Sequence, residues 1–94
     1  MVYRNSLRIV VDILTIAKDS DTESRGVGIT TLLRKGNISY SRLSRLLRDL
    51  VKCGLIEEVD AERGVRYRIS EQGRQFLIAY SRFEEFAQSF GLHL

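Results

Sequence analysis

The sequence has little of what catalytic, metal-binding and disulfide-stabilised proteins need. Its 94 residues include one cysteine, Cys53, and one histidine, His93. A single cysteine cannot form an internal disulfide, which excludes a secreted disulfide scaffold and favours a reducing compartment. A single histidine beside the chain end leaves no zinc site of ordinary spacing and no Ser-His-Asp or Cys-His set. The composition therefore predicts no catalytic residue, no metal and no cofactor, and we expect the protein not to be an enzyme.

Long apolar runs are missing as well. The stretch over residues 9–17 is interrupted by Asp12 and is shorter than the roughly 18 residues that a membrane-spanning helix needs. No small-residue cleavage site follows the first residues, so we expect no secretory signal. The sequence predicts a cytoplasmic protein with no membrane partner. Its length leaves room for a single core, which predicts one domain over residues 1–94.

Positive charge is concentrated in the first part of the chain. The formal net charge is +3, but residues 1–53 hold ten Lys and Arg against five Asp and Glu, whereas residues 54–94 hold five against seven. Arginine outnumbers lysine twelve to three. A guanidinium can bind phosphate or guanine through two parallel hydrogen bonds. The pattern favours a localised anionic partner, the alternative being a solvated surface that happens to use arginine.

The first forty residues predict two helices. Apolar positions and polar breaks give a helix, a loop and a helix over residues 7–18, 19–26 and 28–35. Asn5 or Ser6 is the expected cap of the first helix. Gly36 and Asn37 tolerate positive φ and are expected to end the second helix in a left-handed turn.

Residues 39–53 form the most informative segment. At about 100° per residue, four leucines share one side of the predicted helix: Leu43, Leu46, Leu47 and Leu50. The opposite side is polar and mostly basic, carrying Ser41, Ser44, Arg45, Arg48, Asp49 and Lys52, with Arg42 at the boundary. Ser39 suits the N-cap and Gly54 follows as the residue after the helix. Tyr40 and Cys53 fall on the leucine side, where we expect both to be packed, although Tyr40 could instead contact a ligand.

After Gly54 the apolar period changes to two. The pattern predicts a strand, a turn and a strand over residues 55–60, 61–64 and 65–70. In the second strand Tyr67 and Ile69 point one way, and Arg66 and Arg68 the other. Ser70 is expected to cap a final helix that runs to about Phe90.

Two helices joined by a tight turn, the second of them cationic, and a following hairpin predict a winged helix-turn-helix. The fold class is mainly α (α+β), with the helix-turn-helix and two-stranded wing over residues 6–70. In this arrangement the second helix enters the major groove of DNA. The predicted DNA contacts are Arg34, Lys35, Ser39, Ser41, Arg42, Ser44, Arg45, Arg48, Arg63, Arg66 and Arg68.

The final helix, over residues 71–92, carries a second apolar signal. Its seam has alternating spacings of four and three, as in a coiled coil: Phe76, Tyr80, Phe83, Ala87, Phe90 and Leu94. The alternative is that the stripe folds back on the first helix, as we expect for its first half through Phe76 and Leu77. The second half would be an exposed aromatic patch unless a partner covered it. The sequence thus predicts a homodimer through Phe76, Tyr80, Phe83, Phe86, Ala87 and Phe90.

Several runs of the sequence closely resemble one known family. They are residues 36–40 (Gly-Asn-Ile-Ser-Tyr), the leucine ladder, residues 54–57 (Gly-Leu-Ile-Glu), residues 67–73 (Tyr-Arg-Ile-Ser-Glu-Gln-Gly) and Phe76-Leu77. Together they resemble an archaeal winged-helix family of predicted transcriptional regulators, which includes small DNA-binding chromatin proteins of Sulfolobus. The resemblance covers roughly residues 6–90. It implies a double-stranded DNA ligand, a recognition helix over residues 39–53 and a wing over residues 55–69.

The same resemblance implies that the long C-terminal helix forms an antiparallel coiled coil with a second subunit. The sequence differs from this family in two respects. The helix here ends soon after Phe90, so the dimer contact is expected to be shorter and more aromatic. The net charge of +3 is low for an abundant DNA-coating protein, which favours a regulator at fewer sites. The sequence thus predicts a dimeric regulator in the cytoplasm, associated with the nucleoid. The alternatives are an architectural DNA-binding protein of low specificity and a protein-interaction module that does not bind DNA.

Overall fold

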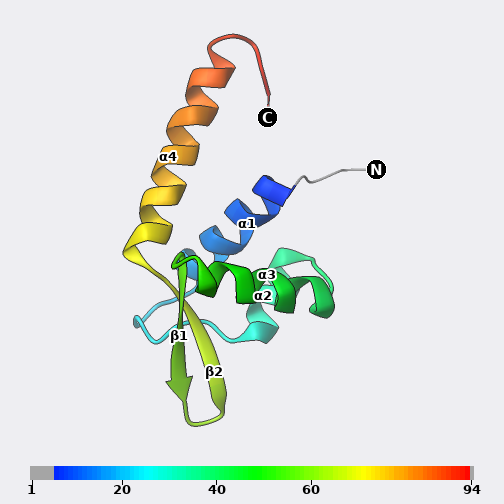
Figure 1. Ribbon diagram of the computed structural model, residues 1–94, viewed down its shortest axis with the longest axis vertical. Coiled ribbons are helices and arrows are strands. Elements are labelled where there is room, and N and C mark those ends of the chain that lie inside the picture. Colours follow the sequence, from blue (N-terminus) through cyan, green and yellow to red (C-terminus); the bar gives the residue numbers. More distant parts are fainter. Residues whose placement is uncertain (1–5, 94) are drawn as a thin grey trace.

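The helices and strands occur in the order that the sequence predicts. The computed structural model of the protein describes residues 6–93, so the predicted cap at Asn5 and seam position at Leu94 lie outside the described residues. Within that range the elements are α1 (Ser6–Asp19), α2 (Ile29–Gly36), α3 (Tyr40–Lys52), β1 (Ile56–Ala61), β2 (Gly64–Ile69) and α4 (Glu71–Gln88) (Figure 1). This is the predicted mainly helical fold, with a helix-turn-helix, a two-stranded wing and a long last helix.

The turn between α2 and α3 depends on the conformation of Asn37 and the small size of Gly36. Asn37 takes the left-handed conformation with φ 50°, and its N–H donates to the carbonyl oxygen of Leu33 at 3.1 Å. Gly36 stays inside the helix and is buried, so only one of the two expected residues is left-handed. A Cβ on Gly36 would lie 2.9 Å from Cδ1 of Ile13. The glycine therefore leaves room for the side chain of Ile13 where α2 approaches α1, and the asparagine provides the left-handed turn.

The wing is a regular antiparallel hairpin. Its register runs from Ile56 opposite Ile69 to Ala61 opposite Gly64. Val27, between α1 and α2, adds a short third segment, because its N–H donates to the carbonyl of Tyr67 at 2.7 Å and its carbonyl accepts from the N–H of Tyr67 at 2.8 Å. A single residue is too short for the alternation by which a strand is recognised, so the sequence does not predict this bridge.

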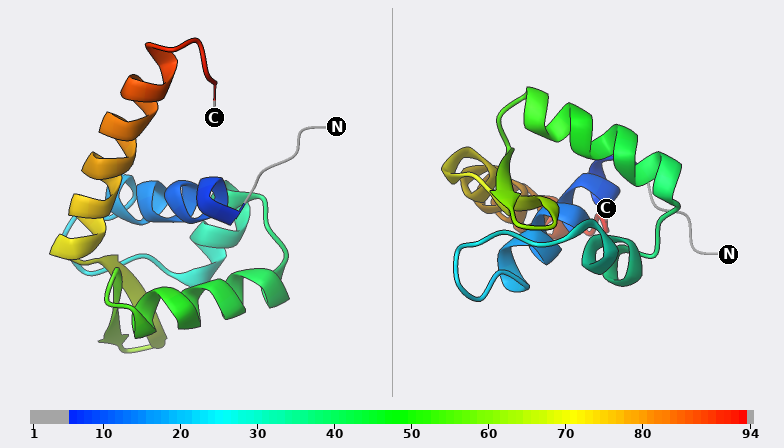
Figure 2. Two further views of the ribbon diagram at one scale, coloured as in Figure 1. Left: turned by 45° about the horizontal axis from the view of Figure 1, so that its top comes forward. Right: turned by 90° about the horizontal axis from the view of Figure 1, so that it is seen from below.

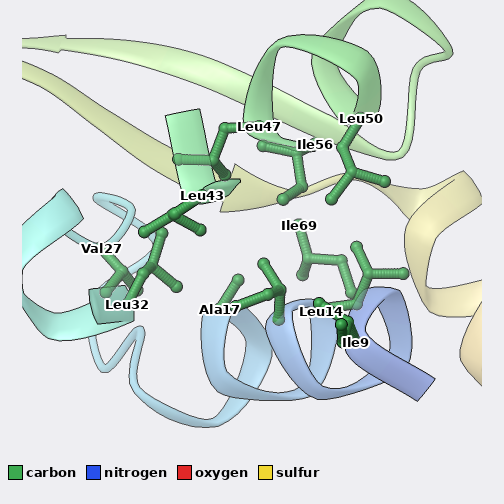
Figure 3. Packing of buried hydrophobic residues seen from close by; sticks show 11 residues of the cluster. Ile9, Leu14, Ala17, Val27, Leu32, Leu43, Leu47, Leu50, Ile56 and Ile69 are labelled. Atoms are coloured by element: carbon green, nitrogen blue, oxygen red, sulfur yellow. The ribbon is translucent and has the colours of Figure 1, made fainter. Parts of the chain in front are cut away.

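The core lies between α1, α3 and the strands (Figure 3). α1 contributes Ile9, Ile13, Leu14 and Ala17. α3 contributes Leu43, Leu47 and Leu50, and the remaining members are Val27, Leu32, Ile56 and Ile69. The leucine ladder of the sequence is therefore a core face, as predicted, with Leu46 partly buried at its edge. Burial of this face fixes the opposite face of α3 toward solvent.

Only the first part of α4 packs against the body of the molecule. The hydroxyl of Ser70 accepts from the N–H of Gly73 at 3.0 Å, as predicted for its cap. Phe76 and Leu77 pack against the core. The helix then rises away from α3 and the hairpin, which lie at the other end of a molecule measuring 49 × 30 × 23 Å (Figures 1 and 2).

Contact between α1 and α4 reaches one turn further than expected. Nη1 of Arg8 lies 3.4 Å from Oη of Tyr80 and 3.4 Å from Oε2 of Glu84. The hydrogen bond that Arg8 donates to the hydroxyl oxygen of Tyr80 is the main reason that the pKa of Arg8 is raised, with smaller contributions from Asp12 and Glu84 against the opposing effect of burial. Tyr80 is therefore half-buried, whereas the sequence places the free part of the helix from Tyr80 onward.

Two packing predictions are wrong. Tyr40 is 64% exposed, because it is the first residue of α3 and lies beyond the core contact of the leucines. Cys53 is also exposed, since it follows the last helical turn, where its thiol lies 3.5 Å from the carbonyl oxygen of Leu50. Angular position on a helix predicts burial only where a neighbouring element covers that turn.

No helix within residues 6–93 is long and apolar enough to cross a membrane. In the same range, no group of three or more His, Cys, Asp or Glu side chains is arranged to hold a metal ion.

Candidate nucleic-acid interface

The outward side of α3 carries a row of basic and hydroxyl side chains. We define its cationic face as Ser41, Arg42, Ser44, Arg45, Arg48, Asp49 and Lys52. Ser44 is half-buried and the others are exposed, whereas Leu43 on the opposite side is fully buried. The Ser39 hydroxyl accepts from the N–H of Arg42 at 3.4 Å and fixes the first turn.

The arginines of this face have no competing partner in the part of the chain that the structure describes. No hydrogen bond or ion pair there engages the guanidinium of Arg42, Arg45 or Arg48. Arg42 and Arg45 border a shallow groove between α1 and α3 of about 200 Å³, whose apolar lining includes Ile9 and Leu46. The five N–H donors of each of these side chains are therefore not engaged by any described residue.

The end of α2 supplies two further predicted contacts in different surroundings. Arg34 is exposed, and no described residue forms an ion pair with it. Lys35 donates from Nζ to the hydroxyl of Ser20 at 2.9 Å and lines a groove along α1 with Arg8 and Asp12. The structure thus places the ammonium of Lys35 beside α1 rather than beside the arginines of α3.

The three predicted arginines of the wing also differ from one another. Arg63 is exposed in the turn between β1 and β2, and its side chain makes no bond to another described residue. Arg66 donates to the carbonyl oxygen of Gly26, from Nε at 3.1 Å and from Nη2 at 2.8 Å. Arg68 donates to the carbonyl of Ser24 at 3.0 Å and to Oε2 of Glu57 at 2.8 Å. Only Arg63 thus resembles the arginines of α3 in having an unoccupied guanidinium.

Tyr40 is the residue of this surface that the sequence assigned to packing. It stands at the start of α3 beside the exposed Ser39 and Ser41. Burial is the main cause of the raised pKa of Tyr67 in β2, with smaller contributions from Glu58 and Tyr40. The place of Tyr40 in the first helical turn is the signal that could have indicated exposure.

The far end of α4 exposes three phenylalanines. We define the aromatic face as Phe83, Phe86 and Phe90, whose exposed fractions are 52%, 62% and 68%. The rings of Phe86 and Phe90 meet edge to face with centroids 5.1 Å apart. Ala87, a predicted interface residue, is only 4% exposed within a single chain. The chain turns back at Gly91, where Leu92 donates from its N–H to the carbonyl of Ala87 at 3.1 Å.

The cationic face of α3 and the aromatic face of α4 are well separated. α3 and the hairpin lie together at one end of the molecule, and the last turns of α4 lie at the other (Figures 1 and 2). A ligand on α3 would therefore leave the aromatic face accessible to a second partner.

Comparisons with known proteins agree with this architecture. A family model described as winged helix-turn-helix matches residues 3–88. The crystal structure of Sso10a-2, a DNA-binding protein from Sulfolobus solfataricus, superposes with a TM-score of 0.74 at 23% sequence identity. The match covers 93% of this chain and 85% of that one. No curated protein matches the sequence. At this level of identity the structural likeness concerns the fold.

Proposed function

Because the chain belongs to the winged helix-turn-helix family, we propose that it binds double-stranded DNA and acts as a transcriptional regulator in the form of a homodimer. α3 is the recognition helix and the hairpin is the wing. The observation that carries this proposal is the cationic face of α3, where Arg42, Arg45 and Arg48 are exposed and unengaged by described residues.

The dimensions and chemistry of α3 suit the major groove. That groove is about 12 Å wide and admits one helix. A guanidinium can form two parallel hydrogen bonds with O6 and N7 of guanine, or bind a phosphate. The short side chains of Ser41 and Ser44, which lie among these arginines, permit a close approach of α3 to the DNA. Affinity would come largely from neutralising phosphates, and selectivity from the few arginines that reach base edges.

The position of the hairpin supports a second contact on the same duplex. β1 begins four residues after α3 ends, so the wing extends from the same end of the molecule (Figure 1). In the proposed complex Arg63, at the turn of the hairpin, would reach the backbone or minor groove beside the site of α3. The structural neighbour from Sulfolobus, described as a DNA-binding protein, supports the same ligand.

The aromatic face of α4 supports the homodimer. Phe83, Phe86 and Phe90 form an apolar surface that a single chain leaves in water. A two-fold dimer would bury the same surface of both copies. It would also present two recognition helices to a palindromic or repeated site.

Alanine variants of α3 test the recognition surface. We expect Arg45→Ala and Arg48→Ala each to weaken binding to duplex DNA by about 1–3 kcal/mol, because each removes contacts to a base or phosphate. Arg82→Ala is the matched control, since Arg82 is an exposed arginine on α4. Fluorescence anisotropy with a labelled duplex measures all three. An equal loss for the three variants would remove the assignment of α3 as the recognition helix.

Salt and competitor titrations separate the remaining functions. DNA binding should weaken steeply on a plot of log affinity against log salt concentration. A weak and flat response would instead favour a protein-interaction module whose arginines meet an acidic protein surface. Competition by non-cognate duplex at fixed salt distinguishes a selective regulator from an architectural protein. A selective regulator should stay bound to its cognate duplex when the competitor is added, whereas an architectural protein should be displaced. Selection of bound sequences from a random duplex library supplies the cognate duplex.

A further inference from the structure

The loop between α1 and α2 has a fixed shape that turns two carbonyl groups toward the wing. The carboxylate of Asp21 accepts from the N–H of Arg25 at 3.0 Å and from the N–H of Gly26 at 3.1 Å. Ser24 and Gly26 have φ values of 59° and 82°. The left-handed conformations and the Asp21 bonds together hold the carbonyl oxygens of Ser24 and Gly26 where β2 can reach them.

Arg66 and Arg68, two residues apart on the same side of β2, donate hydrogen bonds to these carbonyls. The Nε–Nη2 edge of Arg66 is directed at the oxygen of Gly26, with both nitrogens within 3.1 Å. Arg68 bridges the oxygen of Ser24 and the carboxylate of its cross-strand neighbour Glu57. Between them, Tyr67 pairs with Val27 through two backbone hydrogen bonds. We name this set of contacts the loop–wing joint: Ser24, Gly26, Val27, Arg66, Tyr67 and Arg68.

The bonds of the joint compete with phosphate for the same donors. A guanidinium binds phosphate bidentately through an edge of two N–H groups, and in Arg66 the Nε–Nη2 edge is already directed at Gly26. Hydrogen bonds from a charged donor are roughly twice as strong as those between neutral groups, so DNA would have to break strong contacts to recruit this edge. Arg63 has no such contact within the described chain.

We propose that Arg66 and Arg68 are positioning residues that hold the wing against the α1–α2 loop, and that Arg63 makes the phosphate contact of the wing. The inference rests on the proposed DNA binding and assigns the three arginines different roles. Arg66 and Arg68 then affect DNA binding only because they fix the position of Arg63 relative to α3.

The salt dependence of binding separates the two roles. Each phosphate contact contributes about 0.9 to the slope of log affinity against log salt concentration. We expect Arg63→Gln to lower the slope by about that amount. Arg66→Gln and Arg68→Gln should keep the wild-type slope and lower affinity by one constant factor, roughly tenfold or less, at every salt concentration. The probe is a labelled random-sequence duplex, and circular dichroism checks that each variant is folded at the assay temperature.

A variant on the loop side of the joint gives an independent test. A Cβ at position 26 would lie 3.1 Å from Cβ of Arg66 and 3.1 Å from the carbonyl oxygen of Tyr67. Gly26→Ala should therefore produce the same constant-factor loss as Arg66→Gln, and the double variant should lose no more than the larger single loss. If Gly26→Ala does not fold, Arg66→Lys serves in its place. Its ammonium can donate to the same carbonyl and should recover part of the lost affinity.

The outcomes that overturn the inference are distinct from those that overturn the proposed function. Equal reductions of slope for Arg66→Gln and Arg63→Gln would make both residues phosphate contacts and would remove the positioning role. Wild-type affinity in Arg66→Gln and Arg68→Gln would remove it as well. If the wild-type protein itself showed no salt-dependent DNA binding, the proposed function would fail together with the inference.

Discussion

α3 and α4 are both amphipathic, but their apolar sides differ in how far they are buried. Three leucines of α3 are buried among α1, α2 and the strands, and its charged side faces solvent. In α4 only the first turns are covered, and the aromatic face of the last turns stays in water. The periodicity of a helix identifies which side is apolar. Whether that side is core or interface depends on how far the neighbouring elements extend.

The length of α4 explains the difference. Its 18 residues rise by about 1.5 Å each, and the far end of the helix extends past α1 (Figure 2). Tyr80 and Glu84 form hydrogen bonds with Arg8 near the beginning of α1. The last turns of α4 then extend away from α3 and the hairpin (Figure 2).

The largest effect is expected from a cavity under α3. Leu43→Ala should lower the free energy of unfolding by about 2–5 kcal/mol, because Leu43 is fully buried and its truncation leaves a void. Urea denaturation at several protein concentrations measures the loss, which should be the same at each concentration.

Phe86→Ala is the matched control on α4. It should remove only the part of the stability that grows with protein concentration, because Phe86 is exposed in a single chain and would be covered only in the dimer. A loss for Phe86→Ala that is large and independent of concentration would show that the two apolar sides do not differ as described.

The next effect is on assembly. Phe83→Glu should weaken self-association by about 2–4 kcal/mol, since it places a charge in the aromatic face that two copies are proposed to share. Sedimentation should then give a dimer mass for the wild type and a monomer mass for the variant at the same concentration. Circular dichroism should remain unchanged, because Phe83 is half exposed within one chain. A monomer mass for both proteins would contradict the dimer.

Much of the fold could be predicted from the sequence because its signals are local. The caps at Ser39 and Ser70, the leucine ladder and the change of period after α3 each depend on neighbouring residues. They placed the helices and strands to within one or two residues, except that the last helix, expected over residues 71–92, ends at Gln88. The order of these elements predicted their arrangement as a winged helix-turn-helix, and the resemblance to a winged-helix family implied the same arrangement.

The candidate site could be predicted less completely, because it depends on contacts between distant residues. Arg63, Arg66 and Arg68 look alike in the sequence, yet Arg66 lies 40 residues from its carbonyl partner Gly26. The burial of Ala87 likewise depends on which segment covers its helical turn. No local pattern contains that information.

The N-caps of α3 and α4 give a further comparison of the two helices, with smaller expected losses of stability. Ser70→Ala should cost about 1–3 kcal/mol, because the buried hydroxyl accepts from Gly73 and donates to the carbonyl of Gly54 at 2.6 Å. Ser39→Ala should cost about 0.5–1 kcal/mol, since this hydroxyl is exposed and makes one cap bond at 3.4 Å. Thermal or urea unfolding compares the two. A larger loss at Ser39 would contradict the view that α3 is held mainly by its leucines.

The smallest expected effect concerns the only acidic side chain on the cationic face of α3. Asp49 is exposed one helical turn after Arg45, where its charge opposes the approach of phosphate. Asp49→Asn should tighten DNA binding by about two- to fivefold at low salt, and the gain should shrink as salt screens the charge. Glu85→Gln is the matched control, because it removes one exposed negative charge from the far part of α4. Anisotropy titrations at two salt concentrations measure both variants. If the control tightened binding as much as Asp49→Asn, net charge rather than the position of α3 on DNA would explain the effect.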